Sequence, residues 1–181
     1  MNTYITSDLH WGHKNILTFC PYARARFRGD VDYMGEAMIK EWNDLIMPED
    51  LTYILGDVAF LPSLKAIEIM NRLNGTKILI AGNHDKKLLN DPVFRRCFKE
   101  VHDYLEITYE GTKIVMCHYP FAEWNGMHRG AVNFHGHLHG GTSGMEKYRS
   151  RDMGMDATGM IALRMEDAIK SALNGEIKGH H

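Results

Sequence analysis

Five short segments, spread along the sequence, contain side chains of the kinds that bind metal ions. They are Asp8-Leu9-His10, Gly56-Asp57, Gly82-Asn83-His84-Asp85, Cys117-His118 and Gly136-His137-Leu138-His139. Carboxylate oxygens, an amide oxygen and imidazole nitrogens together suit manganese, iron, zinc, cobalt or nickel, whereas magnesium and calcium favour all-oxygen shells. The sequence therefore predicts a site for divalent transition metals.

The spacing within these segments indicates how the ligands would be shared. Asp8 and His10 are two positions apart, so on a continuing strand both side chains would point to one face and could bind one ion. Asp57 follows a glycine, and its carboxylate has two oxygens with which to bridge two ions. Each segment alone is a weak signal, because Asp-x-His also ends ordinary strands and Gly-Asp is an ordinary turn. Their joint occurrence points to a metal centre.

Most of the segments follow a run of β-branched and apolar residues that predicts a strand. These runs cover residues 2–7, 51–55, 77–81, 113–117 and 132–135. Helices are predicted over 35–46, 64–73 and 165–173, with a short one after Asp85 as its N-cap. A hairpin joins 104–109 to 113–117, and a further strand is expected near 160–163. This order predicts a layered α/β domain with a mixed sheet or two stacked sheets, in which ligands bind beyond the carboxyl ends of strands.

Length and composition favour one globular domain. The chain has 181 residues and a formal net charge of −2. It therefore lacks the excess of positive charge typical of proteins that bind nucleic acid, and it has no polybasic membrane patch. We expect a single domain over residues 1–178, with 179–181 as a remnant of a purification tag. The absence of a signal peptide or long apolar run, together with three widely spaced cysteines, predicts a cytoplasmic protein with reduced thiols and no membrane partner.

In this order, the segments resemble the calcineurin-like metallophosphoesterase superfamily, specifically its small single-domain bacterial and phage members. The resemblance runs from Asp8 to His139. It implies an α/β fold, a four-layer αββα sandwich made of two stacked mixed β-sheets flanked by helices, with a dinuclear metal centre at one edge. The implied ligands of the first ion are Asp8, His10, Asp57 and His139, and those of the second are Asp57, Asn83, His118 and His137.

The same resemblance implies that His84 is the catalytic histidine and not a ligand. Manganese is the first expectation for the two ions, with iron, zinc, nickel or cobalt as alternatives. Two ions about 3.5–4 Å apart would clamp a phosphoryl oxygen and a bridging water, and would lower the pKa of that water from about 15.7 towards about 7. The resulting hydroxide would attack phosphorus while His84, as general acid, protonates the leaving oxygen.

One departure from the superfamily narrows the expected substrate. The Ser/Thr protein phosphatase branch extends its motif to Gly-Asp-x-x-Asp-Arg, whereas Gly56-Asp57 is followed here by Val58-Ala59-Phe60-Leu61. We therefore expect hydrolysis of a small phosphomonoester or phosphodiester, such as a nucleotide or cyclic nucleotide. A nuclease is an alternative that the near-neutral charge argues against. A non-catalytic scaffold is another, against which the intact motifs argue.

Substrate contacts are less well marked in the sequence. Arginines surround Phe27 in a predicted loop, and Arg is suited to bidentate phosphate contacts. His13 lies just after the first motif, and an aromatic residue and a cation follow His118. The residues predicted to contact substrate are His13, Arg24, Arg26, Tyr119 and Arg129. For each, the alternative is a solvated surface or simple loop packing, and Asp156 is interpreted as structural.

Overall fold

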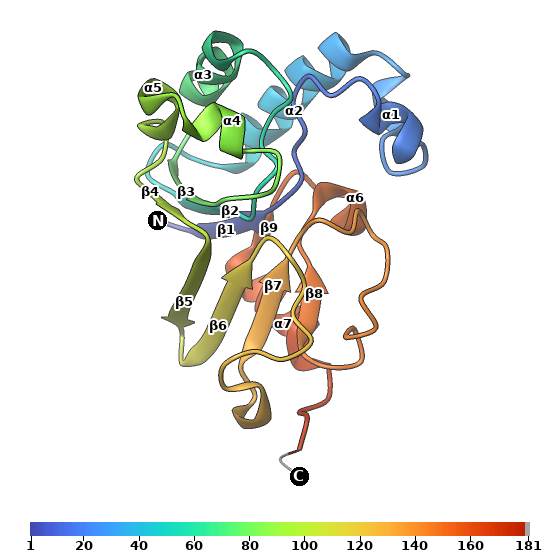
Figure 1. The fold of residues 1–181 in the computed structure, drawn as a ribbon, viewed down its shortest axis with the longest axis vertical. Helices are drawn as coiled ribbons and strands as arrows, with labels where there is room; N and C mark the ends of the chain where they lie inside the picture. Colours follow the sequence, from blue (N-terminus) through green and yellow to red (C-terminus); the bar gives the residue numbers. More distant parts are fainter. Residues whose placement is uncertain (180–181) are drawn as a thin grey trace.

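Two mixed β-sheets form the centre of the molecule in a computed structural model, which describes residues 1–179 (Figure 1). The tag remnant expected at 179–181 lies, apart from Gly179, outside the described residues. The first sheet has the strand order β4-β3-β2-β1-β9, in which β1 to β4 are parallel and β9 is antiparallel. Its strands are β1 (Thr3–Thr6), β2 (Leu51–Ile54), β3 (Thr76–Ile80), β4 (Glu100–His102) and β9 (Leu163–Arg164).

The second sheet has the order β5-β6-β7-β8. Strands β5 and β6 form the predicted antiparallel hairpin, and β6, β7 and β8 are parallel to one another. Its strands are β5 (Tyr104–Tyr109), β6 (Thr112–Cys117), β7 (Val132–His135) and β8 (Ser150–Asp152).

Helices flank the two sheets. In Figure 1, α2 to α5 gather above the first sheet, and α7 lies against the second sheet and the β1–β9 edge of the first. The longer helices are α2 (Val31–Leu45), α3 (Ser63–Arg72) and α7 (Met165–Leu173). The one-turn helices are α1 (Ile16–Phe19), α4 (Lys86–Leu89), α5 (Pro92–Arg95) and α6 (Met155–Thr158), and the 3₁₀ turns are η1 (Ala25–Phe27) and η2 (Met127–Arg129).

Alternation along the strands of the first sheet divides its side chains between two cores. In β3, Leu79 packs with the helices, whereas Ile78 and Ile80 face the second sheet. The inner core also contains Met116 of β6 and Phe134 of β7. A smaller cluster on the other face of the second sheet is covered by the loop that carries η2. The predicted architecture of two stacked mixed sheets flanked by helices is confirmed.

Some predicted elements differ at their ends, and strands β4 and β8 and the one-turn helices α1, α5 and α6 were not predicted. Helix α2 begins at Val31, four residues earlier than predicted, because the Asp30 side chain accepts hydrogen bonds from the backbone N–H groups of Asp32 and Tyr33. The strand expected near 160–163 is the two-residue β9. No helix within residues 1–179 is both long and apolar enough to cross a membrane.

Candidate metal centre

The carboxyl ends of five strands bring the predicted ligands together. Asp8 follows β1, Asp57 follows β2 and Asn83 follows β3, while His118 and His137 follow β6 and β7. Because β1 to β3 are parallel to one another, as are β6 and β7, these ends converge on one edge of the sandwich. Residues that are up to 131 positions apart in sequence thus meet at one place.

The ligand atoms form two groups, within each of which they lie at most 4.8 Å apart. The first group contains Asp8, His10 and His139, and the Oδ1 atom of Asp8 lies 3.8 Å and 3.9 Å from the Nε2 atoms of the two histidines. The second contains Asp57, His118 and His137.

Asn83 joins the second group, because its Oδ1 atom lies 3.0 Å from Nε2 of His118. An amide oxygen there adds a hard ligand without adding negative charge. The structure therefore brings together all seven predicted ligands, although their binding of metal stays a prediction.

A single oxygen of Asp57 faces both groups. Its Oδ2 atom lies 3.6 Å from Nε2 of His118 and 3.8 Å from Nε2 of His10. Its Oδ1 atom accepts a hydrogen bond from the backbone N–H of His84 at 3.0 Å, which fixes the orientation of the carboxylate. This is the placement expected of a carboxylate that two cations share.

Two buried polar atoms at the centre indicate that the residues suit a cation. Oδ1 of Asp8 and Nε2 of His10 are buried and have no hydrogen-bond partner among residues 1–179. Leaving such atoms unsatisfied costs about 1–3 kcal/mol each, and more for a charged group. A divalent ion between them would give both atoms a partner, so the site fits the metal that the ligand types predict.

Hydrogen bonds fix which imidazole nitrogen faces the centre. The Nδ1 atom of His118 donates to the carbonyl oxygen of Leu55 at 2.7 Å, and Nδ1 of His139 donates to Oδ2 of Asp156 at 2.8 Å. Both rings therefore keep Nε2 as the free lone pair that a metal requires.

The candidate ligands also hold unusual backbone conformations. Asp8, His10 and Asp57 have φ values of 54°, 54° and 55°, and His137 and His139 have 73° and 50°. For residues other than glycine this left-handed region is sparsely populated, and such strain clusters at functional sites. The prediction that Asp8 and His10 share a face of a continuing strand is therefore wrong. Left-handed turns beyond the strand aim both side chains at the centre.

Two glycines allow the segments to approach closely. A Cβ atom at Gly136 would lie 1.9 Å from Oγ of Ser7 and 2.5 Å from Oδ2 of Asp8, and one at Gly82 would lie 2.3 Å from Oδ1 of Asp57. The backbone of His137 donates to Asp8 Oδ2 at 2.9 Å through this gap. Any side chain at Gly136 would separate the two motifs.

Asp85 has a role that the sequence interpretation missed. It stands at the predicted position just before α4, but its side chain makes no capping hydrogen bond, so the predicted cap is wrong in that respect. The buried carboxylate instead accepts the backbone N–H groups of Asp57, Val58 and Gly82 at 2.8–2.9 Å. Asp85 thus fixes the turn that presents Asp57.

The predicted substrate contact of Arg24 is contradicted by its burial. This residue is 1% exposed, and its side chain pairs with Asp156, with Nε 2.6 Å from Oδ1. It also donates to the backbone oxygens of Asp8 and Leu9. Its guanidinium is therefore a structural support for the first motif, and Asp156 links it to His139.

The other predicted substrate contacts lie at different distances from the centre. His13 lies next to it, with Nδ1 3.0 Å from Nδ1 of His10, and the ring of Tyr119 lies edge-on to His137 with centroids 4.8 Å apart. Arg26 pairs with Glu41 on the surface. The prediction for Arg129 is wrong, because this exposed residue precedes β7 and so lies at the end of that strand away from the centre.

Burial and charge set protonation states that suit metal binding at Asp8, His10 and His137, whereas at His139 the carboxylates of Asp156 and Asp8 outweigh burial and raise the pKa. Burial would raise the pKa of Asp8, but neighbouring imidazoles, chiefly those of His10 and His139, outweigh it and hold that pKa below its ordinary value. Burial lowers the pKa of His10, and burial together with His118 lowers that of His137. The carboxylate is therefore ionised and these two imidazoles are neutral at neutral pH, as metal ligands must be.

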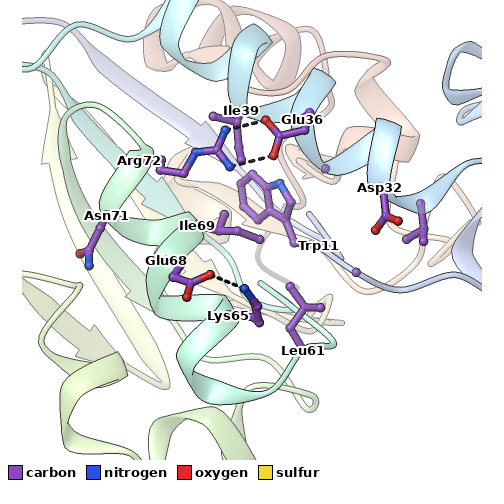
Figure 2. Close-up of a pocket in the computed structure, with 13 residues that line it drawn as sticks. Trp11, Asp32, Glu36, Ile39, Leu61, Lys65, Glu68, Ile69, Asn71 and Arg72 are labelled. Atoms are coloured by element: carbon purple, nitrogen blue, oxygen red, sulfur yellow. Dashed lines mark hydrogen bonds and ion pairs between the residues drawn. The ribbon is translucent and has the colours of Figure 1, made fainter.

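A separate cavity of about 780 Å³ lies between α2 and α3 (Figure 2). Figure 2 shows Arg72 and Glu36 facing each other across it, joined by hydrogen bonds of 2.7 Å and 2.5 Å, and Lys65 paired with Glu68. None of its lining residues belongs to the two ligand groups. It is therefore not the site of the predicted chemistry.

Comparisons with known proteins place this chain in a family with an archaeal relative. No family model matches. The chain is 32% identical over 140 residues to the uncharacterized protein MJ1445 of Methanocaldococcus jannaschii, a match that covers 75% of the chain and 68% of that relative. The chain belongs to the same family as that archaeal protein. The Gene 66 protein of Mycobacterium phage D29 is 28% identical over 187 residues, covering 86% of the chain and 88% of the phage protein.

Solved structures agree with the fold. The protein of unknown function AQ665 from Aquifex aeolicus has a TM-score of 0.71 and 26% identity, covering 93% of this chain and 98% of that one. YfcE, a phosphoesterase from E. coli, has a TM-score of 0.39 and 18% identity, covering 77% of this chain and 70% of that one. At that TM-score the second likeness establishes no shared function.

Proposed function

We propose that this protein is a dinuclear metal-dependent phosphoesterase of the calcineurin-like superfamily that hydrolyses a small phosphomonoester or phosphodiester, such as a nucleotide or cyclic nucleotide. The observation that supports this most strongly is the position of Asp57 Oδ2 between the two ligand groups. A carboxylate so placed joins two cation sites into one centre. Paired divalent ions are a recurring device for displacement at phosphorus.

The proposed ligands follow from the two groups. Asp8, His10 and His139 would hold one ion and Asn83, His118 and His137 the other, with Asp57 bridging. Manganese or a neighbouring first-row metal suits these mixed oxygen and nitrogen donors. When bound, such a pair supplies Lewis acidity, which polarises the phosphoryl group and makes water a nucleophile at neutral pH. The two carboxylates offset part of the cationic charge and leave roughly two positive charges to attract phosphate.

His84 is the proposed general acid. Its backbone N–H is anchored on Asp57, and its side chain remains 47% exposed, with Nε2 4.0 Å from Oδ2 of Asp57. The ring of Phe60 contacts it, with centroids 4.5 Å apart, and limits its rotation. A solvent-facing imidazole at this position can give a proton to the leaving oxygen, a contribution of typically about 10²–10⁴-fold in rate.

The surface beside His84 offers room for a leaving group. A cavity of about 690 Å³ there is lined by residues that include His84, Phe60, Pro62 and Leu88, together with Lys86 and Lys87. Its mostly apolar lining suits an aromatic or sugar-sized group better than a protein chain. This supports a small ester as the substrate.

The experiment is a hydrolysis assay on protein stripped of metal and reconstituted with manganese, iron, cobalt, nickel or zinc. The substrates are p-nitrophenyl phosphate and bis-p-nitrophenyl phosphate, each with and without a chelator. Chelator-sensitive release from the diester supports a phosphodiesterase, and release from the monoester alone supports a phosphatase. Absence of turnover with every metal would contradict the proposal and favour a non-catalytic scaffold.

A further inference from the structure

Another cavity, of about 750 Å³, shares Lys86 and the candidate ligand Asn83 with the cavity beside His84. Gly82, Asn83 and Tyr119 line it on the side of the metal centre, and Lys86 and Arg95 line it on the side of α4 and α5. The ring of Tyr119 lies edge-on to His118 and His137, with centroids 5.1 Å and 4.8 Å apart. The cavity is therefore continuous with the second ligand group.

The cations of this cavity have no partner within the part of the chain that the structure describes. Neither Lys86 nor Arg95 forms an ion pair or side-chain hydrogen bond with any residue in 1–179, whereas Lys65 and Arg72 on the nearby α3 are each paired with a glutamate. Asp103 is the one acidic residue in the lining. The lining thus keeps an excess of positive charge that the protein does not neutralise.

The donors in the cavity match the chemistry of a phosphate. Arg95 offers a planar fork for two phosphate oxygens, and Lys86 offers a compact point charge. Asn90 and the hydroxyl of Tyr119, a residue that is 45% exposed, add neutral donors to the lining. These groups share the lining of the cavity with the candidate ligand Asn83, so one molecule can place one phosphate here and another at the metal centre.

We infer that this cavity binds a second phosphate group of the substrate, so that the substrate class is a small molecule with two phosphates, one at the metal centre and one between Lys86 and Arg95. The inference rests on the proposed function for its first phosphate. It identifies Arg95 as a specificity-determining residue outside the ligand set. It also accounts for cations clustered beside the centre in a chain whose net charge is −2.

The test compares two chromogenic esters that differ by one phosphate. They are thymidine 3′-(p-nitrophenyl phosphate) and the same ester carrying a 5′-phosphate, each assayed with metal-reconstituted wild-type protein, Arg95→Gln and Arg96→Gln. Arg96 is exposed, as Lys86 and Arg95 also are, but it does not line the cavity, so its variant is matched to Arg95→Gln in charge and exposure. We expect the 5′-phosphate to lower KM about tenfold in wild type, the size of one charge-assisted hydrogen bond. Arg95→Gln should abolish this difference, and Arg96→Gln should retain it.

Equal KM values for the two esters in wild type would overturn the inference. If Arg95→Gln and Arg96→Gln lose the KM difference between the esters equally, the inference is also overturned. That result would show general attraction by positive charge and not a specific binding site. A binding measurement distinguishes failure of the second phosphate site from failure of the proposed function. Calorimetry of the metal-loaded protein should show adenosine 3′,5′-bisphosphate binding about tenfold more tightly than adenosine 5′-monophosphate, again only when Arg95 is present. If neither ester is hydrolysed, the proposed function is contradicted. If the bisphosphate and the monophosphate bind with equal affinity, the second phosphate site is contradicted as well.

Discussion

The carboxylate of Asp85 accepts the backbone N–H of Asp57 at 2.9 Å, across 28 residues of sequence. The same carboxylate accepts the N–H groups of Val58 and Gly82, and so ties the end of β3 to the turn after β2. Because Asp57 has a positive φ of 55°, its turn needs such support. The orientation of the proposed bridging ligand therefore depends on a residue outside the two ligand groups.

Asp85→Asn should weaken metal binding without removing a ligand. The amide group would place an N–H₂ against one of the three N–H donors and loosen the turn of Asp57. Loss of a group that holds a metal ligand in position by hydrogen bonding typically lowers metal affinity about 10–100-fold. Calorimetric titration of metal-free protein with Mn²⁺ measures the effect. Asp91→Asn is the control, since Asp91 also accepts a backbone N–H but caps α5. Equal Mn²⁺ affinity in wild type and Asp85→Asn would contradict this role.

His84→Ala should retain both metals and lose turnover by about 10²–10⁴-fold, because the proton donor is lost while all seven ligands remain. Steady-state rates are measured on protein whose metal content is determined in the same sample. His102→Ala serves as the control, since His102 lies on β4 and pairs with Glu100. Normal turnover with full metal occupancy would rule out the acid role of His84.

Asp57→Asn should reduce metal content at both positions, whereas Asp8→Asn should reduce it mainly at one. The reason is that Oδ2 of Asp57 faces both His10 and His118, while Asp8 belongs to a single group. Elemental analysis after gel filtration gives the ratio of metal to protein. We expect about two ions in wild type, about one in Asp8→Asn and fewer in Asp57→Asn. Two retained ions in the last variant would disprove the bridge.

The Arg24–Asp156 pair should make stability depend on pH in the acid range. Burial raises the pKa of Asp156, but hydrogen bonds from His139 and Arg24 outweigh this and lower it to about 2, from an ordinary value of 3.8. Since the folded pKa is the lower one, the pair stabilises the fold above about pH 4 and this stability is lost as pH falls towards 2. The difference corresponds to about 2 kcal/mol.

Asp156→Asn should therefore show no such loss between pH 4 and 2, and should be about 3–5 kcal/mol less stable at neutral pH because Arg24 stays buried without its partner. Urea unfolding of metal-free protein at several pH values measures both effects. Asp44→Asn, at an exposed ion pair with Lys40, is the control and should change stability by about 1 kcal/mol or less. If the free energy of unfolding of Asp156→Asn falls between pH 4 and 2 as much as that of wild type, the pair does not cause this pH dependence.

The strands that position the ligands were predictable because each combines an apolar run with a polar turn. Residues whose roles depend on partners far away in sequence were not. Arg24 and Arg26 have similar neighbours in sequence, yet Arg24 is buried because Asp156, 132 positions later, lies against it. Asp85 has the sequence context of a helix cap, and only the approach of the β2 turn gives its carboxylate other donors. Strands as short as β4 and β8 depend on their neighbours more than on their own composition.

The most direct test of a dinuclear hydrolytic centre is a titration of metal-free protein with Mn²⁺ while hydrolysis of bis-p-nitrophenyl phosphate and p-nitrophenyl phosphate is followed. The proposed function predicts that the rate rises until about two equivalents have been added and then stays constant, and that a chelator abolishes it. A rate that reaches its maximum at one equivalent, or no hydrolysis of either ester at any metal concentration, would contradict it.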